Sequence, residues 1–193
     1  RFGESAKNKK FIINYSIREE ETDVNKIKND IARECFKHFK TPPNTSSLTA
    51  DIFSSGSGLA SSSSYLISFI KALTAQNNVN ISNKRISELA LSLERKFNPL
   101  TGYQDPYGCA IGGLKKININ QFNEVDISPL PIATFKEFNM HLIHTGVSRS
   151  STRQLKKINI DKSAALLPLV GEMEKAIING DTEAIFSIIT QGW

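Results

Sequence analysis

The chain has 193 residues and a net charge of +5, with 39% apolar and 22% charged residues, which is typical of one globular core or one domain plus part of a second. The lysines form no aromatic-interleaved basic stripe, which argues against nucleic acid as a partner, although a mild positive charge suits an anionic substrate. No apolar run reaches the roughly 20 residues that span a bilayer, so we expect no membrane partner.

The N-terminal elements predicted are a strand at residues 10–16, a charged turn at 19–22 and a helix over 24–39, with Asp23 as its cap. A proline-containing break at 41–45 precedes a second strand at 48–53. The two cysteines, Cys35 and Cys109, are too few for a disulfide framework or a zinc site. Both have apolar surroundings in the sequence, and a reducing cytoplasm is the expected environment.

A glycine- and serine-rich segment, 54–64, follows the second strand and opens an apolar helix. Glycines let a backbone approach a ligand closely, and the first N–H groups and the dipole of a helix favour an anion. The serine hydroxyls add ligands for a hard cation such as magnesium. We therefore interpret this segment as a phosphate-binding loop. A flexible linker or an ordinary cap is the alternative, because no P-loop lysine follows.

The next helix begins after Ser82 as its predicted cap and carries Glu94, a residue that is ordinarily a solvated charge. A stretch rich in glycine and proline but poor in charges, residues 98–113, then surrounds Asp105. We interpret Asp105 as an acid held against packed backbone, as in an ordered site. The alternative is a turn-forming aspartate before a proline.

The C-terminal part predicts a hairpin at 115–120 and 125–128, followed by a boundary at 129–131. A strand at 139–144 should end in the polar loop 145–151, where Arg149 would contact an anion or form a structural salt bridge. Helices at 164–178 and 182–190 should be separated at Asn179-Gly180, with Asp181 as the second cap.

Three of these stretches together resemble the GHMP small-molecule kinases, and most of all their D-glycero-D-manno-heptose 7-phosphate kinase branch. The segment 56–63, Gly-Ser-Gly-Leu-Ala-Ser-Ser-Ser, is similar to the family's Gly-x-Gly-Leu-Gly-Ser-Ser-Ser/Ala loop. The segment 102–107, Gly-Tyr-Gln-Asp-Pro-Tyr with a trailing Gly-Gly, resembles the branch's Gly-Lys-Gln-Asp-Gln-Tyr. The segment 144–149, His-Thr-Gly-Val-Ser-Arg, resembles Tyr-Thr-Gly-Ile-Ser-Arg. The three occur in the family's order, and the resemblance covers roughly residues 10 to 193.

The departures from the family pattern are local. Ala60 replaces a glycine, which is tolerable with helical dihedral angles and strained otherwise. Tyr103 and Pro106 replace a common lysine and glutamine, which leaves the sugar contacts open. The family's first strand and its C-terminal glycine-rich loop have no counterpart here, so we expect the chain to be a middle piece of a longer protein.

The resemblance implies an α+β, two-layer GHMP kinase fold. An N-terminal domain like ribosomal protein S5 domain 2 would occupy residues 1–132, and a truncated ferredoxin-like C-terminal domain would occupy 133–193. It also implies an ATP- and Mg²⁺-dependent kinase acting on a sugar or sugar phosphate. The acceptor would be the anomeric hydroxyl of a heptose 7-phosphate, the enzyme would be cytoplasmic, and a homodimer would be compatible with the sequence.

The resemblance also assigns roles to single residues. Asp105 would be the catalytic base, and Ser62 and Glu94 would hold magnesium. The substrate would be bound by Gln104, Asp105, Tyr107 and Arg149. The residues implied to bind ATP are Gly56, Ser57, Gly58, Leu59, Ala60, Ser61 and Ser62. Two alternatives stay open, namely a kinase for fucose, galactose or a related sugar, and a nucleotide-binding module without turnover.

Overall fold

A computed structural model of the chain describes residues 2–3, 9–50, 58–136, 138–147, 155–156 and 163–192. Contacts divide the chain into two compact units, Arg1–Ile111 with Val147–Arg153, and Gly112–Gly146 with Gln154–Trp193. The division after Ile111 differs from the predicted domain boundary after residue 132. That boundary stays a prediction.

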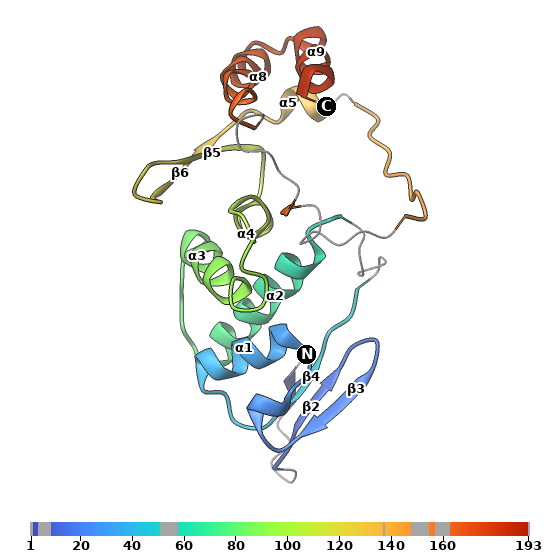
Figure 1. Cartoon of the computed structure of the whole chain (residues 1–193), viewed down its shortest axis with the longest axis vertical. Coiled ribbons are helices and arrows are strands. Elements are labelled where there is room, and N and C mark those ends of the chain that lie inside the picture. Colours follow the sequence, from blue (N-terminus) through green and yellow to red (C-terminus); the bar gives the residue numbers. More distant parts are fainter. Residues whose placement is uncertain are drawn as a thin grey trace. The chain divides into compact units, whose positions relative to one another are not determined.

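The first unit contains a four-stranded sheet in the order β1-β4-β2-β3 (Figure 1). Its strands are β1 (Phe2–Gly3), β2 (Phe11–Asn14), β3 (Arg18–Glu21) and β4 (Thr45–Ser47). β2 pairs parallel with β4 and antiparallel with β3. A parallel pair needs a crossover connection, which here contains η1 (Val24–Lys26) and α1 (Asp30–Phe39). The sheet and its covering helices confirm the predicted α+β class.

The charged segment 19–22 was predicted as a turn, and this prediction is wrong for residues 19–21, which belong to β3, whereas Thr22 forms a bend after the strand. The reason is tertiary: Glu19 is buried and its carboxylate accepts hydrogen bonds from the backbone N–H groups of Lys28 and Asn29, at 2.7 and 3.0 Å. Tyr15 Oη also donates to it at 2.5 Å. Burial and this carboxylate raise the pKa of Tyr15 to about 12. The Glu19 carboxylate thereby satisfies two backbone hydrogen-bond donors just before the start of α1.

The predicted helix 24–39 is formed as two pieces. Asp23 caps only the short η1, where its side chain accepts from Asn25 N at 2.9 Å. Asn29 caps α1 by accepting from Ala32 N at 3.0 Å. An extended residue, Ile27, ends η1, and its buried side chain belongs to the core. The apolar spacing in the sequence therefore runs across a break in the helix.

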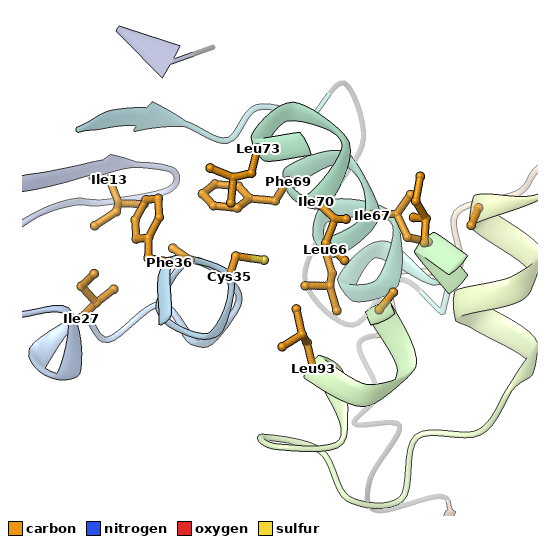
Figure 2. Close-up of a cluster of buried hydrophobic side chains, with 14 of the residues drawn as sticks. Ile13, Ile27, Cys35, Phe36, Leu66, Ile67, Phe69, Ile70, Leu73 and Leu93 are labelled. Atoms are coloured by element: carbon orange, nitrogen blue, oxygen red, sulfur yellow. The ribbon is translucent and has the colours of Figure 1, made fainter. Parts of the chain in front are cut away.

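Two longer helices, α2 (Ser61–Gln76) and α3 (Asn83–Glu94), agree with the predicted helices. Ser82 caps α3 by accepting from Arg85 N at 3.2 Å, as predicted. Figure 2 shows how Phe36 of α1 lies between Ile13 of the sheet and Phe69 of α2. The rings of Phe36 and Phe69 meet edge-on, with centroids 5.3 Å apart. The core is thus built where β2, α1, α2 and α3 meet.

The strand predicted at 48–53 is not formed in its described part, because residues 48–50 lie outside the strands. The strand in this part of the chain is β4, which begins at the last residue of the predicted break, 41–45, and ends just before the predicted strand. Residues 51–53 lie outside the described residues. The short helix α4 (Gln104–Ala110) completes the first unit and buries Tyr107 and Ala110.

The second unit contains the predicted hairpin, as β5 (Lys115–Ile119) and β6 (Val125–Pro129). Among its described residues it also contains the helices α5 (Ala133–Lys136), α8 (Leu167–Asn179) and α9 (Thr182–Gly192). Gly180 ends α8 in the left-handed conformation at φ 67°, and Asp181 accepts from Ala184 N at 3.0 Å. The predicted break at Asn179-Gly180 and the predicted cap at Asp181 are therefore both confirmed. Lys116 Nζ links the hairpin to α8 through Glu174, at 2.6 Å.

The strand predicted at 139–144 is wrong, because these residues form no strand. Met140, Leu142 and Ile143 are all more than three-quarters exposed, at 76%, 76% and 79%. Within the described residues no strand pairs with this segment, and an unpaired strand has no ladder to hold it. The alternating apolar residues of this segment were therefore not sufficient to form a strand.

The helices α8 and α9 bury Ala176, Ile177, Ile185 and Ile188 between them. Other apolar residues remain open to solvent, among them Leu167 at 70%, Phe186 at 54% and Ile189 at 50% exposed. None of the helices in the described ranges has the length and apolarity to cross a bilayer.

We expect the 193-residue chain to self-associate through this exposed apolar face, because contiguous apolar surface favours association. Light scattering across a concentration series should show this association, and replacing Leu167 and Ile189 with lysine should reduce it. The matched control replaces Ile119 with lysine, which is 46% exposed on the hairpin. A chain that stays monomeric at all concentrations would contradict the prediction.

Candidate functional site

The start of α2 is the centre of the candidate site. Gly58 and Ala60 are in the left-handed conformation, at φ 75° and 53°, and the side chain of Ala60, the residue before the helix, makes no capping hydrogen bond. The first helical bond runs from Ser64 N to Ala60 O at 2.9 Å. The N–H groups of Ser62 and Ser63 precede this bond and point out of the helix end. Together with the helix dipole they favour an anion at this point.

Glu94, at the C-terminal end of α3, faces the first turn of α2. Its side chain is 4% exposed, and Oε2 accepts a hydrogen bond from Ser63 Oγ at 2.6 Å. The usual interpretation of such a glutamate as a solvated charge is therefore wrong here. A carboxylate buried beside a helix N-terminus has to be held by donors, because burial without partners is costly.

The electrostatics of Glu94 result from opposing effects. Burial raises the pKa of its carboxyl, and the negative charge of Asp105 raises it further. Hydrogen bonds from Ser63 and Ser62 oppose this by stabilising the carboxylate, but the net shift of the pKa is upward. A divalent cation beside this carboxylate would favour the ionised form.

Asp105 lies in the first turn of α4 and is exposed. It is therefore part of a helix, whereas the sequence predicted a loop that packs around it. Its charge acts on Glu94, which places the two acids near one another. Gln104 begins the same helix and is also exposed. Tyr107 is only 2% exposed, so little of its surface is available to a ligand, and its substrate contact stays a prediction.

A thiol joins α4 to the loop before α2. Cys109 Sγ lies 3.9 Å from the carbonyl oxygen of Ala60, which accepts its weak hydrogen bond. Cys35 is buried, in line with its apolar surroundings in the sequence, whereas Cys109 is exposed. Burial raises the pKa of Cys35 well above its usual range. The packing of α4 within the first unit positions it beside the candidate site. The apolar sequence neighbours of Cys109 did not indicate this position.

Arg95 stabilises the segment that leads into α4. Its Nε donates to the carbonyl of Thr101 at 3.1 Å, and its guanidinium lies 5.1 Å from the ring centroid of Tyr103. The Tyr103 ring in turn lies 6.1 Å from that of Tyr107. Tyr103, which replaces a common lysine of the family, is therefore engaged in packing and cation–π contact. Sequence reasoning missed Arg95 because no local pattern connects it to Asp105.

Three of the predicted site residues, Gly56, Ser57 and Arg149, lie outside the described residues. The remaining ones come together from the ends of three helices of one unit: Ser62 from α2, Glu94 from α3 and Asp105 from α4. Figure 1 shows these helices side by side. Ser63 also lies at the start of α2, and the predicted site residues did not include it.

The donor set fits magnesium bound together with a nucleotide. Magnesium commonly uses one or two carboxylates plus phosphate oxygens and keeps several waters. Glu94 supplies a carboxylate, and the exposed Ser62 supplies a hydroxyl beside it. The described residues contain no group of three or more His, Cys, Asp and Glu side chains that would hold a metal by themselves. Phosphate oxygens at the start of α2 would therefore have to complete the coordination.

The comparison with protein families agrees with this geometry. The profile of the GHMP kinases N terminal domain matches residues 25–113, which include α1 to α4 and the whole candidate site described above. Residues 25–113, less than half of the chain, are thus similar to this family's N-terminal domain. The match ends close to Ile111, where the contacts divide the chain. The chain has the α+β fold that the resemblance implied.

Proteins similar to the chain include three whose names describe sugar kinases. The chain is 26% identical over 181 residues to a D-glycero-alpha-D-manno-heptose 7-phosphate kinase of Campylobacter jejuni. This alignment covers 86% of this chain and 53% of the relative. A solved D-glycero-D-manno-heptose 1-phosphate kinase from Bacteroides thetaiotaomicron superposes with a TM-score of 0.70 at 18% identity, over 100% of this chain and 64% of that one. A second solved structure, from Campylobacter jejuni, gives a TM-score of 0.67 at 20% identity, over 97% and 62% of the two chains. The chain thus spans between half and two thirds of the length of these proteins.

The left-handed Ala60 provides a test of the loop geometry. A non-glycine residue in this conformation costs about 1–2 kcal/mol, whereas glycine costs about 0.5–1 kcal/mol through the entropy of the unfolded chain. We therefore expect Ala60→Gly to raise the free energy of unfolding by about 0.5–1 kcal/mol in urea titrations. Ala72→Gly, within α2, is the control and should lower it by up to about 1 kcal/mol. Equal losses from both would show that Ala60 is unstrained.

Proposed function

We propose that this chain forms the nucleotide-binding part of a GHMP sugar kinase, which transfers the γ-phosphoryl group of ATP to a sugar hydroxyl. The acceptor in this proposal is the anomeric hydroxyl of D-glycero-D-manno-heptose 7-phosphate, and the product is the 1,7-bisphosphate. The observation that carries it is the position of the buried Glu94, which accepts a hydrogen bond from the first turn of α2 at 2.6 Å and whose pKa is raised by the charge of Asp105. The family of the domain and the names of its relatives support the same chemistry.

The chain's own residues would bind and orient the reactants. The N–H groups at the start of α2 would hold phosphate oxygens, and the left-handed Gly58 and Ala60 would bring the loop backbone close to them. Glu94 and Ser62 would hold the magnesium, which, when bound, would neutralise charge on the transferring phosphoryl group. Phosphoryl transfer requires mainly positioning and charge neutralisation, and this arrangement supplies both.

Asp105 would act on the acceptor. As an exposed carboxylate in the first turn of α4, it would accept the proton of the attacking hydroxyl while that oxygen bonds to the γ-phosphorus. The bond between that phosphorus and the β–γ bridging oxygen breaks, and ADP leaves. Exposed Gln104 would contact the sugar from the same helix end. Because this chemistry uses ATP, we place the enzyme in the cytoplasm.

A coupled assay for ADP release tests this proposal on the full-length protein. The acceptor panel contains the heptose, its 1-phosphate and its 7-phosphate, because the relatives carry two different names, and adds fucose and galactose. We expect turnover to be largest with the 7-phosphate. Turnover only with another sugar would support the alternative of a kinase for fucose, galactose or a related sugar. ATP binding without turnover on any acceptor would support a module without catalysis.

Arg149 is proposed to contact the phosphate that the sugar itself carries. Arg149→Lys loses the bidentate fork of a guanidinium, so we expect the Michaelis constant for the sugar phosphate to rise far more than that for ATP. Steady-state kinetics with each substrate varied in turn measures both constants. Arg153→Lys, four residues along the chain, is the control. Equal effects of Arg149→Lys on both constants would favour a structural salt bridge.

A further inference from the structure

Ser63 is buried in the first turn of α2, and the reaction as proposed gives it no role. Its side chain is 1% exposed, and its hydroxyl donates at 2.6 Å to a carboxylate 31 residues further along the chain. We propose that Ser63 is a positioning residue, which orients the Glu94 carboxylate so that it can bind the divalent cation of the kinase. This inference rests on the proposed function of the site.

The two neighbouring serines have different surroundings. Ser62 is exposed and Ser63 is buried, although both hydroxyls hydrogen-bond to Glu94. An exposed hydroxyl can rotate away from the carboxylate toward a cation or a water. A buried hydroxyl that is 2.6 Å from its acceptor has no alternative partner in solvent. Ser62 is thus suited to be a ligand that exchanges partners, and Ser63 to be a fixed anchor.

The anchor leaves the carboxylate able to bind metal. A carboxylate has about four lone-pair sites, and Ser63 occupies one of them, on Oε2. A charge-assisted hydrogen bond of this kind is stronger than a neutral one, so it can fix the plane of the carboxylate. Such partners of metal ligands orient the ligand and tune its basicity.

A purely structural bond between α2 and α3 makes a different prediction. It would affect the stability of the fold and leave metal affinity per folded molecule unchanged. The chain offers a matched control for this case in Ser87. Ser87 is 0% exposed on α3, the helix that carries Glu94, and its hydroxyl donates to the Asn83 carbonyl at 2.9 Å.

The experiment compares Ser63→Val with Ser63→Thr, two side chains of the same shape that differ by a hydroxyl. Binding of Mn²⁺ in the presence of ADP, whose phosphate oxygens would complete the coordination, is measured by electron paramagnetic resonance titration, and melting temperatures report the fold. We expect Ser63→Val to weaken Mn²⁺ binding by about 10-fold and Ser63→Thr to restore most of it. Ser87→Ala should lower the melting temperature and leave Mn²⁺ affinity as it is. In the kinase assay, Ser63→Val should raise the Mg²⁺ concentration for half-maximal rate and leave the Michaelis constant for the sugar unchanged.

Equal Mn²⁺ affinities of the Val and Thr variants would overturn the inference while the proposed function stands. An unmodified protein that binds neither Mn²⁺ nor ATP would overturn the proposed function, and the role of Ser63 with it. A fall in Mn²⁺ affinity with Ser87→Ala equal to that with Ser63→Val would likewise assign the effect to packing and overturn the inference.

Discussion

Asp105→Asn in the full-length protein should lower turnover by roughly two to four orders of magnitude and leave ATP affinity nearly unchanged, because a general base acts mainly in the transition state. The position of the residue supports this expectation. Asp105 is an exposed acid at the start of α4, near enough to the buried Glu94 to raise its pKa. Single-turnover kinetics and nucleotide titration measure the two effects separately.

The control for Asp105 is Asp30→Asn. Asp30 is also in the first turn of a helix of the same unit, α1, where it pairs with Arg33. This variant removes a similar charge from a similar position and should leave turnover unchanged. Near-normal turnover of the Asp105 variant would remove this residue from the mechanism.

Glu94→Gln should lower turnover strongly while it stabilises the fold. A metal that neutralises transition-state charge contributes several kcal/mol, and at about 1.36 kcal/mol per factor of ten its loss means roughly two to three orders of magnitude. The buried charge itself is unfavourable, because burial and Asp105 raise the pKa of Glu94 despite the hydrogen bonds from Ser63 and Ser62. A neutral amide removes this cost and its oxygen can still accept from Ser63. We therefore expect a higher melting temperature in the variant.

The same residue predicts a pH dependence of stability. Because the pKa of Glu94 is higher in the folded than in the unfolded chain, the folded chain binds the proton more tightly. The contribution of the protonated carboxyl is therefore present below the unfolded pKa of 4.5 and is lost as pH rises through the folded pKa. Urea titrations across this window should show a decline that Glu94→Gln flattens. A variant with an unchanged profile would contradict the assignment.

The control for Glu94 is Glu88→Gln on the same helix. Glu88 pairs with Arg85 at 2.9 Å and is partly exposed. It should change turnover little, because it contacts solvent and a surface arginine. A loss of turnover equal to that of Glu94→Gln would mean that the charge of α3, rather than the position of Glu94, controls activity.

The sequence by itself determined those elements whose signals are local. A helix follows the glycine- and serine-rich segment because apolar residues recur along α2, and Ser82 caps α3 because a serine oxygen can reach the N–H three residues on. Gly180 and Asp181 separate α8 from α9 for the same reason: a left-handed residue and a cap need only their own neighbours. The order of three short motifs was enough to indicate a similarity to the GHMP kinases, which the comparisons also found.

The tertiary structure alone decided where distant groups meet. It made β3 from a charged segment because Glu19 is buried against the backbone that precedes α1, and it left 139–144 without a strand. It put Ala60 in the left-handed conformation where the sequence left helical dihedral angles open. It also buried Glu94 and paired it with Ser63, 31 positions earlier in the chain. Periodicity reports which face of an element is apolar, but not which polar group of another element it will meet, since that contact depends on how the helices pack.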